Sequence, residues 1–168
     1  MKKYYTLFTV LVMCFAFAAS NAQRPAFTSA DLKQMEGEWK GTIIYLDYTT
    51  KKPFSMPADL KVKRITKHQL IFFNIYPKEP KANNADTILF TKNGRKVNKE
   101  FVKSKQVLPN GNTEIITEYE SVDGNDNKPA TIRHTYTIGS AILINKKDVL
   151  FKESNEWINR HIYSYLRK

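Results

Sequence analysis

Apolar and β-branched residues alternate with polar ones along most of the chain, which is the pattern of strands with one buried face. Turn residues interrupt the alternation at Asn93-Gly94, Asn110-Gly111 and Asp123-Gly124, because tight hairpins need the positive φ that glycine allows. The pattern predicts strands over residues 37–48, 58–66, 68–76, 86–92, 95–107, 112–121, 130–139, 141–151 and 156–166.

A short segment before the first strand has a helical pattern instead. Residues 28–35 predict one or two helical turns with apolar side chains on one face, and Ser29 can cap their N-terminus. Pro53 and Pro57 follow the first strand and indicate an irregular connection there.

These elements predict one all-β domain. A meander of eight to ten strands removes its exposed edges by closing on itself, so we expect a single up-and-down antiparallel β-barrel with a short N-terminal helix. A two-sheet β-sandwich is the alternative. A barrel of this strand number has an interior that is either packed or holds one small ligand.

The first 22 residues have the layout of a secretory signal peptide. Lys2 and Lys3 precede an apolar run over residues 4–19, and small residues stand at the positions that precede a cleavage site after Ala22. The run is too short for a membrane span. We therefore expect residues 23–168 to form the mature barrel domain, exported to a periplasm or secreted, with no transmembrane segment.

The chain is basic, with a formal net charge of +11, or +9 once Lys2 and Lys3 leave with the signal. Such a charge favours anionic partners such as an acidic glycan or an envelope lipid surface, and we expect no nucleic-acid partner. Because the lysines are spread along the chain, a solvated basic surface also explains it. The only cysteine is Cys14, so we expect no disulfide and no thiolate metal site in the mature protein.

The segment Gly37-Glu38-Trp39 follows the predicted helix and opens the first strand. It resembles the G-x-W opening of the lipocalin-like, or calycin-type, β-barrels. The resemblance implies that Trp39 closes the barrel base and that Arg160, on the last strand, packs across its indole. A C-terminal helix and disulfides are not apparent, so the chain is most similar to small exported lipocalin-like proteins of Gram-negative bacteria.

The period of two selects side chains that point into such a barrel. If Trp39 points inward, so do polar and aromatic residues on the same strand and on two later ones. Small-molecule sites combine apolar walls with a few such polar groups, although a packed barrel core has the same composition. The candidate ligand-binding residues are Tyr45, Phe72, Tyr119, Arg133, His134 and Tyr136, with Arg133 or tyrosine hydroxyls orienting a ligand that carries an acidic group.

The sequence has three histidines and no H-x-H or H-E-x-x-H spacing, so it predicts no metal site. Haem is the cofactor alternative, because barrels related to the haem-binding nitrobindin type use one proximal histidine, for which His134 and His161 are candidates. The chain has no G-x-S-x-G, P-loop or dinucleotide motif, and no catalytic residue is assigned.

Three functions follow from these patterns. The first is binding of a small, mostly apolar ligand inside the barrel. The second is an interaction module with a filled barrel, which docks an acidic glycan, a lipid surface or a protein through its basic face. The third is an enzyme with a cluster around His134 at the barrel mouth.

Overall fold

The computed structural model describes residues 24–168 apart from residues 48, 51 and 126. Within these residues, one helix precedes eleven strands that form one antiparallel sheet, which confirms the predicted fold class. The elements are α1 (Ser29–Met35), β1 (Gly37–Leu46), β2 (Pro53–Pro57), β3 (Asp59–Thr66), β4 (Gln69–Ile75), the 3-10 turn Pro80–Ala82, β5 (Asn84–Leu89), β6 (Lys96–Val97), β7 (Glu100–Val107), β8 (Thr113–Asp123), β9 (Lys128–Ile138), β10 (Ile142–Phe151) and β11 (Ile158–Arg167).

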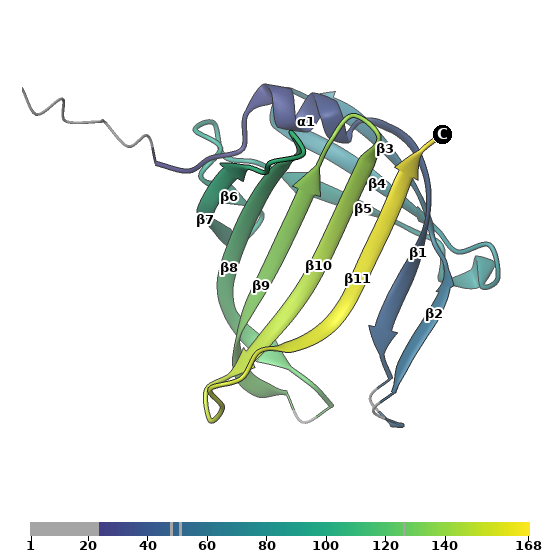
Figure 1. The fold of residues 1–168 in the computed structure, drawn as a ribbon, viewed down its shortest axis with the longest axis vertical. Helices are drawn as coiled ribbons and strands as arrows, with labels where there is room; N and C mark the ends of the chain where they lie inside the picture. The colour runs from purple at the N-terminus through teal and green to yellow at the C-terminus, as the bar shows by residue number, and fades with distance from the viewer. Residues whose placement is uncertain (1–23, 48, 51, 126) are drawn as a thin grey trace, which may run out of the picture.

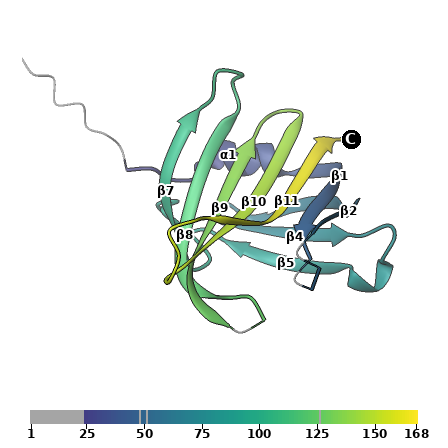
Figure 2. The same ribbon diagram turned by 60° about the horizontal axis from the view of Figure 1, so that its bottom comes forward.

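The sheet curls until its two ends almost meet (Figures 1 and 2). Its order is β5-β4-β3-β1-β11-β10-β9-β8-β7-β6, with β2 paired to the far end of β1. The first long strand therefore lies beside the last one, as an up-and-down meander requires when it closes. A single bridge between Phe90 and Val97 joins the β5 end to β6. The result is a nearly closed barrel rather than a sandwich, and α1 lies across one end of it.

The structure corrects three local predictions. Residues Pro53–Pro57 form β2 instead of a loop, which prolines allow because the strand pairs only with β1. The predicted strand over 95–107 is divided, because Asn98 has a φ of 49° and turns the chain between β6 and β7. Thr28, not Ser29, caps α1, and Asp31 completes a capping box by accepting from the Thr28 amide at 2.6 Å.

Trp39 is fully buried at the helix end of the barrel, and its indole Nε1 donates to the Met35 carbonyl at 2.9 Å. The expectation that Arg160 covers it is wrong. Arg167 is the register partner of Trp39 and lies over its ring. Arg160 stands seven residues earlier on β11, about 23 Å away at 3.3 Å per residue. There it donates to Asp123 at 2.7 Å.

The signal peptide predicted for residues 1–22, and Cys14 within it, lie outside the described residues. Within the described part of the chain, no helix has the length and apolar character needed to cross a bilayer.

Candidate ligand cavity

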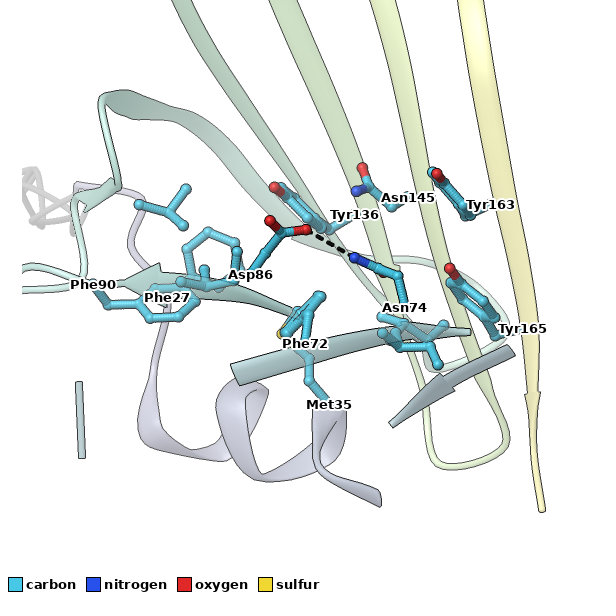
Figure 3. A pocket seen from close by; sticks show the side chains of 14 residues that line it. Phe27, Met35, Phe72, Asn74, Asp86, Phe90, Tyr136, Asn145, Tyr163 and Tyr165 are labelled. Carbon is cyan, nitrogen blue, oxygen red and sulfur yellow. Dashed lines mark hydrogen bonds between the residues drawn. The ribbon is translucent and has the colours of Figure 1, made fainter. Parts of the chain in front are cut away.

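A cavity of about 160 Å³ lies inside the barrel, next to α1. Its apolar lining comes from the N-terminal segment, α1 and the strands on both sides of the barrel, and comprises Phe27, Met35, Leu60, Phe72, Ile88, Phe90, Val97 and Leu143. Its polar lining comprises Asn74, Asp86, Tyr136, Asn145, Tyr163 and Tyr165 (Figure 3). This composition, mostly apolar with a few polar groups, is that of a small-molecule site.

Strand register explains how part of this lining is layered. Tyr136, Asn145 and Tyr163 are neighbours across β9, β10 and β11, so they form one row of inward side chains. Ile138, Leu143 and Tyr165 form the next row, two residues closer to α1 on each strand. Since side chains alternate across a strand, the two rows face the same side of the sheet. The cavity lies where these rows meet the helix end.

The cavity tyrosines are held as neutral phenols. Burial raises the pKa of Tyr136 well above its usual value, and the charge of Glu100 adds to the effect. Burial likewise raises the pKa of Tyr165 and of Tyr163. The Tyr163 hydroxyl also shares a 2.9 Å hydrogen bond with the Tyr76 hydroxyl. These phenols therefore offer hydroxyl donors and acceptors at any pH near neutrality.

Two amides and one carboxylate complete the polar lining. Asn74 Nδ2 donates to Asp86 Oδ2 at 2.8 Å, a bond that Figure 3 shows among the lining side chains. Asp86 is exposed, so it stands where the cavity meets solvent. The side-chain oxygen of Asn145 is buried without a hydrogen-bond partner within the described residues. An unpaired buried acceptor is costly, so a small rotation that brings it to a ligand donor would be favourable.

A second polar cluster fills the barrel beyond the cavity. Glu100 is buried and accepts from the Thr117 hydroxyl, and His134 Nδ1 lies 3.0 Å from the same carboxylate oxygen. One carboxylate oxygen of Glu100 therefore contacts both the Thr117 hydroxyl and the His134 ring. The His161 ring lies 6.4 Å from that of His134, and burial lowers its pKa to about 4.

An ion-paired group lies at the barrel end away from α1. Asp123 accepts from Lys147 at 2.8 Å and from Arg160 at 2.7 Å, and its side chain is only 5% exposed. Burial alone would raise the pKa of Asp123, but the two cations together lower it. This group stays ionised and holds β8, β10 and β11 together.

The structure places five of the six sequence-predicted residues in three different surroundings inside the barrel. Phe72 and Tyr136 line the cavity. Tyr119 and His134 are stacked 6.3 Å apart in the second polar cluster. Tyr45 packs against a separate small cluster around Met56.

Arg133 does not face the barrel interior. Its Nε donates to Glu118 at 2.8 Å, and its guanidinium lies 3.8 Å from the centroid of the Trp157 ring. The alternation of side chains explains this placement, because its neighbours Ile132 and His134 both point inward. Arg133 therefore cannot orient a ligand in the cavity, and the cation that was expected to bind an acidic ligand group is not there.

Sequence reasoning missed most of the lining. Tyr163 and Tyr165 had a usable signal, because they alternate with His161 along the last strand. Phe27 and Met35 precede the sheet, and their inward placement depends on how α1 packs. Asn74 and Asp86 come together only through the β4–β5 pairing, which places Phe72 opposite Asp86.

Within the described residues, no group of three or more histidine, cysteine, aspartate or glutamate side chains is arranged to hold a metal ion. The two inward imidazoles, His134 and His161, are separated by Lys147 in the register of β9, β10 and β11.

No family model and no curated protein matches the sequence. Among matching solved structures, the crystal structure of Rv2717c from M. tuberculosis is 15% identical, with a TM-score of 0.50 over 86% of this chain and 99% of that one. A protein with unknown function from the DUF3598 family of Nostoc punctiforme is 12% identical, with a TM-score of 0.40 over 86% of this chain and 51% of that one. The first similarity supports the barrel fold.

Proposed function

We propose that this protein binds a small, mostly apolar ligand inside its barrel, in the manner of a lipocalin-like carrier. The observation that carries the proposal is the cavity of about 160 Å³ with predominantly apolar walls. An apolar engineered cavity of about 150 Å³ holds one benzene molecule. The cavity therefore fits a ligand portion of about one aromatic ring, and a larger ligand would extend past Asp86 into solvent.

Two features support the lipocalin-like part of the proposal. Trp39 closes the barrel base from a G-x-W segment that follows a short helix, and an arginine from the last strand lies across its ring. We also propose that the protein is exported. That proposal rests on the signal-like residues 1–22, and a purified mature protein that begins at Gln23 would support it.

Native mass spectrometry of the protein from its own cells, beside a denatured control, tests the main proposal. A retained small mass that is lost on denaturation is the expected result. A retained mass equal to haem would instead assign the ligand to the haem alternative, with His134 or His161 as the candidate axial residue. A bare mass, together with no thermal stabilisation by toluene, would overturn the proposal.

A pair of matched variants locates the binding. Leu143 lines the cavity and Leu166 is 64% exposed on the neighbouring strand, so the same change can be made inside and outside. Leu143→Phe fills part of the space and should weaken toluene binding at least tenfold, whereas Leu166→Phe should not change it. Equal effects of the two variants would place the binding elsewhere.

A second candidate function rests on a basic groove on the outer face. Arg24, Lys92, Arg95 and Lys96 line it together with Phe101, which is 52% exposed, and no acidic residue is among its described lining residues. Such a groove suits an acidic glycan. The Lys96 ammonium lies 4.1 Å from the centroid of the Phe101 ring, so a sugar could stack only on the opposite ring face.

Retention on a sulfated polysaccharide column, measured against salt, tests this candidate. The double variant Lys92→Gln/Arg95→Gln should elute at lower salt than Lys78→Gln/Lys81→Gln, which removes the same charge elsewhere. Equal elution of the two would contradict it.

A further inference from the structure

We propose that the cavity selects a small monocationic amine, with its apolar part among the aromatic walls and its ammonium group at Asp86. The inference rests on the proposed function, because it assumes that the cavity is a ligand site. It assigns the chemical class of the ligand, and it replaces the acidic group that the sequence alone suggested.

The first argument is charge. Asp86 is the only charged side chain among the fourteen described residues that line the cavity. It forms no ion pair within the described part of the chain, and its hydrogen-bond donor is the neutral amide of Asn74 at 2.8 Å. A carboxylate at the rim of an apolar cavity favours a ligand cation, because a charge-assisted hydrogen bond is stronger than a neutral one.

The second argument is the aromatic wall. Six of the lining residues are aromatic, and ring faces attract a cation through their electron-rich π systems. The nearby charges have the same sign, since Asp86 contributes to the raised pKa of Tyr163 and Glu100 contributes to that of Tyr136. Asp86 and Glu100 are thus the acidic groups close enough to act on the cavity tyrosines.

The third argument concerns where the cations of this basic protein are. Arg133, the expected anchor for an acid, lies outside the barrel with Glu118. Lys147, which does point inward, is paired with Asp123 beyond the cavity. A ligand carboxylate would therefore lie near Asp86 with no lysine or arginine in the described lining to pair with it. Repulsion by Asp86 would add to the free-energy cost of desolvating that carboxylate.

The net charge of +11 does not reverse this selection. At physiological ionic strength, exposed charges are screened over about 8 Å, so distant surface lysines contribute little. A direct charge-assisted hydrogen bond between a bound ammonium and Asp86 would outweigh them.

Benzylamine, benzyl alcohol and benzoate test the proposal, because they share one benzene ring and differ in the charge of the head group. Affinities are measured by calorimetry at pH 7, where the amine is a cation. We expect benzylamine to bind about tenfold more tightly than benzyl alcohol, and benzoate to bind most weakly. The variant Asp86→Asn should remove the preference for the amine. Glu114→Gln, which removes one negative charge from the outer β8 face beside Gln106, should keep it.

The outcomes separate the two proposals. If benzyl alcohol binds and benzylamine binds no better, the amine inference is overturned while the cavity function stands. If the preference persists in Asp86→Asn, the ammonium lies elsewhere and the assignment to Asp86 is overturned. If neither these probes nor toluene binds, both proposals fail.

Discussion

The guanidinium carbon of Arg167 lies 4.0 Å from the centroid of the Trp39 ring, which places the end of the last strand over the first strand. Arg167 also donates to three backbone carbonyls, at Gln34, Glu36 and Ser140, over 2.6 to 2.8 Å. This one side chain therefore connects the end of α1, the β9–β10 turn and the base of the barrel.

Replacing Arg167 should destabilise the barrel. Arg167→Ala removes a cation–π contact and three hydrogen bonds to backbone carbonyls of the helix end and a turn, and we expect a loss of about 2 kcal/mol in the free energy of unfolding. Arg167→Lys should restore only part of this stability, because an ammonium lacks the planar, spread N–H donors with which a guanidinium reaches several carbonyls at once. Urea unfolding measures the change, and Arg95→Ala, on an exposed turn, is the control. A loss below that of the control would show that the stack is not stabilising.

The arginine that packs on Trp39 could not be predicted from the sequence, although the inward faces of the strands could. The period of two places Tyr136 on an inward face, and it is buried there with Ile132 and Ile138 of the same strand, because alternation is a local property of each strand. Which arginine meets Trp39 depends instead on the register between β1 and β11, which are more than a hundred residues apart in the chain. Alternation separates the two arginines, since Arg167 shares the face of Tyr163 and Tyr165 and Arg160 does not, but only the register shows which residue of that face lies opposite Trp39.

The cavity was less predictable than the fold for the same reason. Phe72 and Tyr136 come from the alternation, but the division of the barrel into an apolar end and a polar end depends on how distant strands are staggered. Asp86 carries no signal in its own segment, since an exposed aspartate on a short strand is ordinary. It becomes informative only because no other described lining residue is charged.

The free energy of unfolding should fall as the pH drops from about 6.5 to 4, in part because of His161. Burial, together with the nearby charges of His134 and Lys147, lowers the pKa of His161 from 6.5 to about 4. Asp123 and Asp148 oppose the shift without reversing it. Between these two values the unfolded chain binds a proton that the folded protein does not, so stability rises with pH across this window.

The variant His161→Gln measures that contribution. Between pH 7.5 and pH 4.5, the variant should lose about 2 to 3 kcal/mol less of its free energy of unfolding than the unchanged protein. The reason is that about two pH units of this range lie between the unfolded and folded pKa values of His161, and one proton contributes about 1.4 kcal/mol per unit. Urea unfolding at both pH values gives the number, and His68→Gln, in the β3–β4 turn, is the control for losing an imidazole. An unchanged slope in His161→Gln would show that the pKa of His161 is the same in the folded and unfolded states.

The ion-paired group at the other barrel end should be sensitive to loss of its acid. Asp123→Asn leaves the cations Lys147 and Arg160 with one fewer negative charge in a buried site, and we expect a loss of about 3 to 5 kcal/mol. Asp86→Asn makes the same chemical change at an exposed position and should alter stability by less than about 0.5 kcal/mol. Thermal unfolding compares the two variants at neutral pH. Similar melting temperatures would contradict the assignment of Asp123 as a structural centre.

Gly94 holds the N-terminal segment against the cavity, because its carbonyl accepts from the Phe27 amide at 2.9 Å. Its φ is +68°, and a Cβ added to it would clash with the Phe27 carbonyl oxygen. Gly111 has a similar φ of +80°, but a Cβ added there would meet no atom within 4 Å. A substitution at Gly111 therefore isolates the backbone strain from the steric clash.

In both alanine variants, strain in the left-handed backbone should lower the free energy of unfolding by about 1 to 2 kcal/mol. The steric clash should lower it further in Gly94→Ala. The additional loss has a functional consequence, because the clash displaces Phe27, whose ring packs 5.0 Å from Phe90 and 5.7 Å from Tyr136 in the cavity wall. We expect Gly94→Ala to weaken toluene binding while Gly111→Ala retains it, as measured by thermal shift against toluene concentration. Equal binding by the two variants would mean that Phe27 does not shape the ligand site.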